Sequence, residues 1–483
     1  MDHYNNNSIN RIKVVSKNSD KLNFKNPKMT EGKMGQAKSK GKRSIRQSIK
    51  EHWREFAAAS AGNALEFYDI LIYGYFAITI GHLFFPNKDS AVSLLIAVGT
   101  FGISFITRPL GSVVLGSYAD KAGRKASMTL SISLMVVGTA MITFCPTYET
   151  IGIWAPLIII IARMLQGFST GGEFGSSVAF LVEHAGIDKR GFFASFQMST
   201  QGLATVFAAG FSALLFALLT PEQLNAWGWR LAFAFGLFIG PIGLYIRRSV
   251  AETADFESVK TSRPKNTPLH DLFKYNWRDI LLCIGLVAAA TAFNYVHKIY
   301  MPTYAIKQLH LPETFSFIGA MITGVMLLIV SPMVGAISDR FGRIRIVGIS
   351  LIFLGITSWP LFYILNAMPV PAVLFAVQAF VGFLLACSLA AMPALIAEIF
   401  PTNVRSTGLA ISYNLAVTIF GGFAPLIATW LIQTTHNNMS PSFYVMFTVL
   451  LSLISISFLA HRHQIAEPKE NSQSKALKQG TQE

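Results

Sequence analysis

Three polar residues occur at intervals of three in the first long apolar segment of the chain, namely Asn63, Glu66 and Asp69. Residues at this spacing lie along one side of an α-helix. Two carboxyl groups held this close in an apolar surrounding are suited to binding and releasing a proton near neutral pH. We therefore expect Asp69 or Glu66 to carry a coupled proton and Asn63 to bind a substrate. The alternative is that the carboxyl groups only hydrogen-bond neighbouring helices.

A second polar set lies in a later apolar segment and consists of Arg163, Gln166 and Glu173. Arg163 and Glu173 share a helical face but lie ~15 Å apart along it, which is too far for a direct ion pair. We expect Arg163 to pair with a carboxylate of the first segment or with a bound anion, and Gln166 to contact the substrate. Glu173 is a further candidate for proton coupling. Glycines at intervals of four in the same segment let two helices approach closely. These glycines are Gly167, Gly171 and Gly175.

A third polar set lies in the segment 279–305. Thr291, Asn294 and Lys298 fall on one helical face, and His297 lies one step off it. Lys298 and Arg163 would supply one cation from each half of the chain, an arrangement suited to clamping a di- or tricarboxylate. The alternatives are that Lys298 extends along its apolar stem to a lipid–water interface and that His297 is structural. Neutral hydrogen-bonding candidates for the substrate are Asn294, Gln197 and Gln201.

These charges stand in a mostly apolar chain. Of its 483 residues, 52% are hydrophobic and 13% are charged, whereas soluble domains carry roughly 25% charged residues. The composition argues against a soluble enzyme or a nucleic-acid-binding protein and indicates a chain surrounded by lipid. The three cysteines show no metal or disulfide spacing, and no nucleophile elbow or phosphate loop occurs. We therefore expect neither an enzyme nor a bound cofactor or metal.

Twelve apolar segments are long enough to cross a membrane as helices. They are 56–84, 92–116, 126–146, 151–181, 191–219, 228–247, 279–305, 312–336, 346–366, 370–397, 408–434 and 441–461. A polar connection of about thirty residues separates two sets of six. The expected organisation is a basic cytoplasmic tail over 1–54, a first half over 55–247, a cytoplasmic loop over 248–278, a second half over 279–461 and a cytoplasmic C-terminal tail over 462–483.

Positive charge is unevenly distributed along the chain. Residues 1–54 hold 14 Lys and Arg against 4 Asp and Glu, and this stretch has no apolar period, so we expect it to be disordered. Met29 or Met34 is an alternative start. If the connections between segments alternate sides, almost all of their Lys and Arg fall on one side and only Lys88 and Lys307 on the other. By the positive-inside rule both termini are then cytoplasmic, which agrees with an even number of spans.

Two patterns recur in the two sets of six segments. The sequence GSYADKAGR at 116–124 recurs as GAISDRFGR at 335–343, 219 positions later. A Glu and an Arg seven residues apart recur 215 positions later. These residues are Glu183 with Arg190 and Glu398 with Arg405. Duplication of a six-helix unit is typical of secondary transporters, which bind substrate at the repeat interface near the middle of the membrane.

The recurring loop pattern resembles the motif that follows the second helix of the major facilitator superfamily. In that family its charged residues latch the two halves together at the cytoplasmic side. The resemblance implies an all-α membrane protein with twelve transmembrane helices in two pseudo-symmetric six-helix halves, and a cytoplasmic gate. The gate residues would be Asp120, Gly123 and Arg124, their counterparts Asp339, Gly342 and Arg343, and Arg108, which precedes the pattern by eight residues.

Further motifs resemble the metabolite–proton symporters of this superfamily, which include carriers of citrate, 2-oxoglutarate, shikimate, proline and betaine. They are GNALEFYD at 62–69, FFP at 84–86, RPLG at 108–111, RMLQGFSTGGE at 163–173, WGWR at 227–230 and FGGFAP at 420–425. The resemblance covers about residues 55–460. The family associates an arginine of its fourth helix with proton coupling, and the resemblance carries that role to Arg163.

We therefore expect a proton-coupled symporter that imports a small organic acid such as citrate, a dicarboxylate or 2-oxoglutarate by alternating access across a bacterial inner membrane. The alternative substrate is a zwitterionic osmolyte such as proline or glycine betaine, for which Tyr68, Tyr73, Tyr295 and Tyr300 would form an aromatic cage. A further alternative is a sensor, or a protein whose basic tail binds anionic lipid. The expected partners are the substrate, protons and the lipid bilayer, without nucleic acid, and the chain is expected to be a monomer.

Overall fold

The computed structural model describes residues 62–122, 124–172, 189–249, 268–400 and 405–479. These residues form α-helices, three short π-helical segments and turns, and they contain no β-strand. In lipid a backbone can satisfy its polar groups only within a helix or a closed barrel, so uniformly apolar runs of this length fold as helices. Each of the twelve apolar segments expected from the sequence is helical in its described part.

The first six segments form the first half. Its helices are Gly62–Tyr75 (called the first helix below), α3 (Ala77–Phe84), α4 (Ser90–Ala122), α5 (Arg124–Phe144), α6 (Tyr148–Ile151), α7 (Trp154–Gly171), α9 (Arg190–Leu218), α10 (Pro221–Gln223), the π-helical η3 (Leu224–Gly228) and α11 (Trp229–Ser249). The first helix and α3 together cover the described part of the expected segment 56–84, and they meet at an angle of 63°. Gly74 lies just before the bend and packs closely on Ile299 of the second half.

The last six segments form the second half. Its helices are α13 (Pro268–Tyr275), α14 (Trp277–Asn294), η4 (Tyr295–Tyr300, π-helical), α15 (Met301–Lys307), α16 (Glu313–Phe341), α17 (Arg343–Ala367), α18 (Pro371–Leu389), α19 (Met392–Ile399), α20 (Arg405–Val417), η5 (Thr418–Gly422, π-helical), α21 (Ala424–Thr435) and α22 (Ser440–Gln479). The expected membrane-crossing segment 441–461 agrees with the apolar span Ser440–His461, and the helix α22 continues beyond that span to Gln479. The added residues are rich in Ala, Glu, Lys and Gln, which favour helix.

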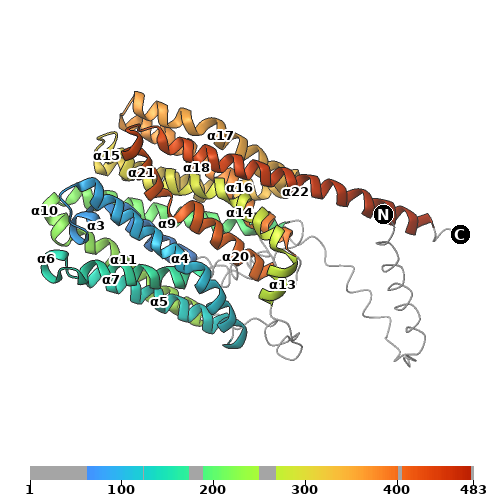
Figure 1. The fold of residues 1–483 in the computed structure, drawn as a ribbon, viewed down its shortest axis with the longest axis horizontal. Helices are drawn as coiled ribbons and strands as arrows, with labels where there is room; N and C mark the ends of the chain where they lie inside the picture. The colour runs from blue at the N-terminus through green and yellow to red at the C-terminus, as the bar shows by residue number, and fades with distance from the viewer. Residues whose placement is uncertain (1–61, 123, 173–188, 250–267, 401–404, 480–483) are drawn as a thin grey trace, which may run out of the picture. The chain divides into compact units, whose positions relative to one another are not determined.

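Eight helices among the described residues are long and apolar enough to cross a membrane, and the bent pair formed by the first helix and α3 makes a ninth. Within the second half, α22 packs along α14 and α17 (Figure 1). The exposed side chains of α22 include Phe443, Phe447 and Phe458. Large apolar residues on an outer surface agree with a lipid surrounding rather than water.

The two halves meet along two helix pairs. On one side α9 packs against α16, and on the other α4 packs against α20 and α21. The α9–α16 contact has two glycine crossings, Gly191 with Gly335 and Gly202 with Gly324. The crossings are eleven residues apart on both helices, which is close to three turns. A Cβ added at Gly202 would lie 2.7 Å from the oxygen of Gly324, so these backbones touch.

The glycines of α7 serve the packing of the first half, as expected from their spacing. A methyl group at Gly167 would overlap the backbone oxygen of Ser104 on α4, and one at Gly171 would overlap the backbone oxygen of Arg108. Gly111 makes the reciprocal contact on Phe168. This close approach brings the polar side chains of α4 and α7 together. Gly175 lies outside the described residues.

Candidate functional site

Asp69 lies inside the first half, between the first helix, α5 and α11. Its side chain is 2% exposed. Thr139 on α5 donates a hydrogen bond of 2.6 Å to Oδ2, whereas Oδ1 has no hydrogen-bond partner among the described residues. Gly236 on α11 makes room for the carboxyl group, because a Cβ there would lie 2.6 Å from Oδ1. A buried carboxyl oxygen without a partner is costly, and it is a place where a proton can bind.

Arg163 on α7 is 1% exposed and is held by polar neighbours and aromatic rings. Its Nη1 donates to Oε1 of Gln166 at 2.8 Å, and its Nη2 donates to Oγ of Ser104 at 3.0 Å. The guanidinium carbon lies 4.3 Å from the ring centre of Tyr73. Its Nε has no hydrogen-bond partner among the described residues.

A hydrogen-bond chain connects Arg163 to Asp69. Gln166 accepts from Arg163 and donates through Nε2 to Oγ1 of Thr139 at 2.9 Å, and Thr139 donates to Asp69. The expected direct pairing of Arg163 with a first-helix carboxylate is therefore wrong in detail, since two side chains intervene. The two charges still interact electrostatically. A change of charge at Asp69 therefore changes the electrostatic energy of the Arg163 guanidinium group.

Glu66 lies in a different surrounding from Asp69. It is buried and interacts electrostatically with Tyr295 of η4 and Tyr413 of α20, both in the second half. Asp69, in contrast, contacts α5 and α11 of the first half. The expected carboxylate pair is therefore divided, with one carboxyl group facing inside the first half and the other facing the second half.

Arg108 lies with Asp69 and Arg163, although the sequence placed it in the cytoplasmic gate. Its side chain is 3% exposed, and its guanidinium carbon lies 3.9 Å from the ring centre of Phe105. A narrow cavity, too small in this conformation to admit a water molecule, is lined by residues from four helices. The lining residues are Asp69, Ile70, Ser104, Arg108, Met135, Arg163, Gln166, Gly167 and Thr170.

Lys298 is fully buried, with 0% of its surface exposed. Its Nζ lies 5.6 Å from the ring centre of Phe67 and has no hydrogen-bond partner among the described residues. Its backbone carbonyl accepts a hydrogen bond of 3.4 Å from the hydroxyl of Tyr75. The alternative in which Lys298 extends to a lipid–water interface is therefore wrong in this structure. Lys298 instead faces the first helix across the boundary between the halves.

The neighbours of Lys298 differ in their surroundings. His297 stacks on Phe293 with ring centres 3.9 Å apart and lies against Phe362, which favours its structural interpretation. Asn294 is buried, and its Oδ1 has no hydrogen-bond partner in the described part of the chain. The π-helical η4 begins directly after Asn294.

Asn63 and Gln197 bind each other. Gln197 Nε2 donates to Oδ1 of Asn63 at 2.7 Å, and Asn63 Nδ2 donates to the backbone oxygen of Gln197 at 3.0 Å. Asn63 also donates to Thr200 at 2.6 Å. In this conformation the pair joins the first helix to α9. Gln201, one turn further along α9, is buried, and its Nε2 has no partner among the described residues.

The second copy of the loop motif joins the two halves. Asp339 on α16 accepts hydrogen bonds from the backbone amides of Gly191 at 2.8 Å and Phe192 at 2.9 Å, in the first turn of α9. A carboxylate at this position satisfies free amides and stabilises the helix dipole. Arg343 forms ion pairs with Asp339 at 2.9 Å and with Glu398.

The turn between α16 and α17 needs glycine, because Gly342 has a φ of +90°. The first copy of the motif is less well described. Gly123 and Glu173 lie outside the described residues, and so do the side chains of Asp120 and Arg124.

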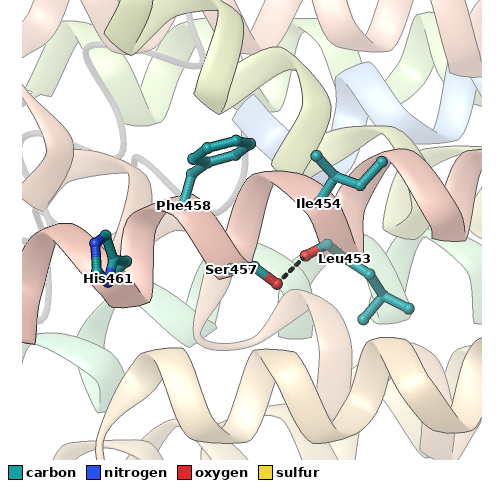
Figure 2. Close-up of a pocket in the computed structure, with 5 residues that line it drawn as sticks. All are labelled: Leu453, Ile454, Ser457, Phe458 and His461. Atoms are coloured by element: carbon teal, nitrogen blue, oxygen red, sulfur yellow. Dashed lines mark hydrogen bonds between the residues drawn. The ribbon is translucent and has the colours of Figure 1, made fainter.

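A separate groove lies on the outer surface of α22. Figure 2 shows its lining side chains, which all come from that helix, namely Leu453, Ile454, Ser457, Phe458 and His461. The hydroxyl of Ser457 donates to the backbone oxygen of Leu453 at 2.7 Å (Figure 2), so it is already satisfied within the helix. The groove has none of the buried charges that the centre of the bundle has.

Comparison with known sequences shows the family. A family model of the major facilitator superfamily matches residues 67–367 and 314–482. The chain is 35% identical over 411 residues to the citrate-proton symporter of Klebsiella pneumoniae, covering 84% of this chain and 91% of that protein. It is 34% identical over 412 residues to the proline/betaine transporter of Escherichia coli strain K12, covering 83% of this chain and 82% of that protein.

Comparison with solved structures shows the same fold. A crystal structure of a D-xylose-proton symporter superposes with a TM-score of 0.66 at 19% identity, covering 83% of this chain and 97% of that one. A partially occluded, inward-open structure of the xylose transporter of Escherichia coli superposes with a TM-score of 0.67 at 15% identity, covering 85% of this chain and 97% of that one. The chain belongs to the major facilitator superfamily, and its resemblance to the metabolite–proton symporters of that superfamily is confirmed.

Proposed function

We propose that the protein imports a small organic acid anion together with protons across a bacterial inner membrane, with both termini in the cytoplasm. Its relatives named citrate-proton symporter and proline/betaine transporter support proton-coupled uptake. The proposal depends on the hydrogen bonds that link Arg163 to Asp69 through Gln166 and Thr139. They join a buried cation to a buried carboxyl group inside one rigid half.

Coupling follows from the charges of this network. While Asp69 is charged, it attracts Arg163 and competes with any anion for the guanidinium group. A proton on Asp69 removes that competition, so the proton and the anion favour each other's binding. Lys298 supplies a cation from the second half, and a bound anion would draw Lys298 and Arg163 together. Asn294 and Gln201 would add neutral hydrogen bonds to the substrate.

Alternating access would then depend on the motif loops. The Asp339 contacts with α9 hold the cytoplasmic ends of α9 and α16 together. Their opening would release the substrate and proton to the cytoplasm. We assign this gate to Asp339, Gly342 and Arg343, and by the repeat to the first copy of the motif. The first-copy residues are Asp120, Gly123 and Arg124.

The second candidate substrate is a zwitterion such as proline or glycine betaine, which the 34% identical proline/betaine transporter favours. The four tyrosines expected to form a cage do not all face one place. Tyr68 donates to the carbonyl of Ala232 in α11, and Tyr300 lies against Tyr304. The face of Tyr73 is already covered by Arg163. A quaternary ammonium needs open ring faces, so this arrangement supports the anion.

The test is uptake into proteoliposomes with an imposed inward proton gradient. Labelled citrate, succinate, 2-oxoglutarate, proline and glycine betaine would be supplied separately. We expect accumulation of at least one carboxylate and its loss when a protonophore collapses the gradient. Uptake that is independent of the gradient, or confined to the zwitterions, would reject the proposal.

A substitution at Asp69 tests whether this carboxyl group binds the coupling proton. Asp69→Asn should abolish uphill accumulation while counterflow exchange of the same carboxylate continues, because the uncharged amide resembles the protonated state. Glu313→Gln, at an exposed position in the first turn of α16, is the control and should leave accumulation unchanged. Undiminished accumulation by Asp69→Asn would show that the coupling proton binds elsewhere.

A further inference from the structure

We propose that Arg108 binds substrate, and that together with Arg163 it holds one carboxylate group of a di- or tricarboxylate between two guanidinium groups. This inference rests on the proposed anion transport and names the substrate class. It assigns to Arg108 a binding role in place of the gate role expected from its position before the loop motif.

The backbone contact of α4 with α7 places the two side chains together. Gly171 of α7 lies directly on the backbone of Arg108, and Gly167 lies directly on the backbone of Ser104. Ser104 is one helical turn before Arg108, and its hydroxyl accepts the hydrogen bond from Arg163. Arg163 therefore lies against the same face of α4 that carries Arg108, and both side chains line the cavity beside Asp69.

Both guanidinium groups lie on one row of aromatic rings. The guanidinium carbon of Arg163 is 4.3 Å from the ring centre of Tyr73, and that of Arg108 is 3.9 Å from the ring centre of Phe105. Phe101 connects these rings, with centres 6.3 Å from Tyr73 and 5.3 Å from Phe105. Stacking covers the face of a guanidinium group and leaves its N–H edge for in-plane hydrogen bonds. Gln166 and Ser104 accept two of these bonds from Arg163, and Tyr295 hydrogen-bonds Arg108. A bound carboxylate would compete with these neutral acceptors for the same N–H groups.

Two buried cations this close need an anion. Arg108 and Arg163 repel each other electrostatically, and Arg163 is attracted to Asp69, which lines the same cavity. Arg108 hydrogen-bonds Tyr295, which also interacts electrostatically with Glu66. The Nε atoms of both arginines also have no hydrogen-bond partner in the described part of the chain. Burying like charges together is strongly unfavourable unless a counter-charge compensates them. Asp69 supplies one counter-charge while it is ionised. When a proton neutralises Asp69, a carboxylate of the substrate would supply that charge, and a second carboxylate could reach Lys298.

The gate arginine shows a different pattern. Arg343 is paired with two carboxylates of its own half, Asp339 and Glu398, and it lies at the start of a helix. Arg108 stands instead in the interior of α4, on an aromatic ring and beside the cavity. A latch residue needs a fixed partner that separates when the gate opens. A substrate-binding residue needs donors that line the cavity and are held by neutral acceptors, which a charged ligand can replace.

The test compares kinetic constants of purified full-length variants in proteoliposomes. Citrate and succinate serve as multivalent probes, and acetate serves as the monovalent competitor. Arg108→Gln should raise the KM of citrate and of succinate at least tenfold, equal to about 1.4 kcal/mol of binding, while Vmax changes less than twofold. Inhibition by acetate should change much less. The KM of Arg108→Lys should lie between that of Arg108→Gln and that of the wild type. Lysine keeps the positive charge but lacks the planar guanidinium group that binds a carboxylate through two parallel hydrogen bonds.

Two comparison variants are expected to differ from Arg108→Gln in their kinetic constants. Arg343→Lys should lower Vmax for every substrate and leave KM ratios unchanged, as a gate residue would. Arg278→Gln, near the exposed start of α14, should change neither constant. If Arg108→Gln behaves like Arg343→Lys, or leaves the KM of citrate and succinate unchanged, Arg108 does not bind substrate.

Folding and the underlying function are checked separately. If Arg108→Gln does not fold, Arg108→Lys decides the question, since it retains a cation at the same site and should still raise KM at least threefold. An unchanged KM in Arg108→Lys would then overturn the proposal. Failure of the proposed function is recognised in the wild-type protein itself, which would transport neither citrate nor succinate.

Discussion

The hydroxyl group of Ser199 on α9 donates a hydrogen bond to the backbone carbonyl of Leu328 on α16, with 2.8 Å between the oxygen atoms. In a regular helix that carbonyl would accept from the amide four residues later, but residue 332 is a proline and has no N–H. The hydroxyl of the opposite half therefore satisfies a carbonyl that the proline leaves free. The bond lies between the two glycine crossings of α9 with α16.

The other contact between the halves repeats this relationship. Pro109 inside α4 leaves the carbonyl of Phe105 free, and Thr418 of η5 donates to it at 2.8 Å. The same hydroxyl also lies 2.7 Å from the carbonyl of Asn414 in its own helix, so it is shared. Each contact between the halves thus has one carbonyl freed by proline and one hydroxyl from the facing helix. Loss of such a bond would leave the backbone hydrogen bonds of both helices intact.

Ser199→Ala should destabilise the contact of α9 with α16. The substitution leaves a buried carbonyl without a donor, which costs about 1–3 kcal/mol. We expect a lower Tm and faster labelling of a cysteine introduced at position 195 at this interface. Ser350→Ala is the matched control, because Ser350 is equally buried but donates only within its own helix, to Ile346. Equal Tm values for the two variants would show that the bond between the halves contributes nothing measurable.

Gly111→Ala should disrupt the packing of α4 on α7. A methyl group there would overlap the backbone oxygen of Phe168, and a backbone atom cannot move aside as a flexible side chain can. Overpacking of this kind costs typically about 1–3 kcal/mol. The control is Gly99→Ala in the same helix, where the nearest atoms belong to the side chain of Leu426 at 3.9 Å. Fluorescence-detected gel filtration and Tm should show loss of folded protein for Gly111→Ala alone.

Much of the fold could be predicted from the sequence, because it follows from apolar length and repetition. The described parts of the twelve apolar segments are helical, and the doubled loop motif indicates Asp339 as a functional residue. The partners themselves, the amides of Gly191 and Phe192, carry no side-chain signal. Only their place at the start of a helix could have indicated them.

The candidate site was predicted less completely. Thr139 and Ser104 hold the polar network together. Both hydroxyls also lie within hydrogen-bond distance of a carbonyl in their own preceding turn, as the hydroxyl of Thr143 does. Nothing in the sequence shows which of these hydroxyls also contacts another helix. Arg108 was assigned by distance along the chain to the motif, whereas the glycine contacts of α4 with α7 decide where its side chain lies.

Asp339→Asn should weaken the contact of α16 with the start of α9. The substitution removes the charge that pairs with Arg343 and replaces one acceptor oxygen by a donor that cannot bind the amide of Gly191 or Phe192. Loss of a helix cap costs about 0.5–2 kcal/mol. We expect faster labelling of a cysteine at position 195 and a lower Vmax at unchanged KM. Arg340→Gln, at an exposed neighbouring position, should behave as wild type. A change of KM alone would place Asp339 outside the gate.

Lys298→Met should separate a binding role from a structural one. The fully buried ammonium group has no hydrogen-bond partner among the described residues, so an apolar chain of similar length removes a desolvation cost. We therefore expect the Tm without substrate to rise, while the KM of citrate increases at least tenfold and citrate no longer raises the Tm. Lys307→Met, at an exposed position on α15, should alter none of these quantities. A fall in Tm together with an unchanged KM would mean that Lys298 supports the fold and does not bind the substrate.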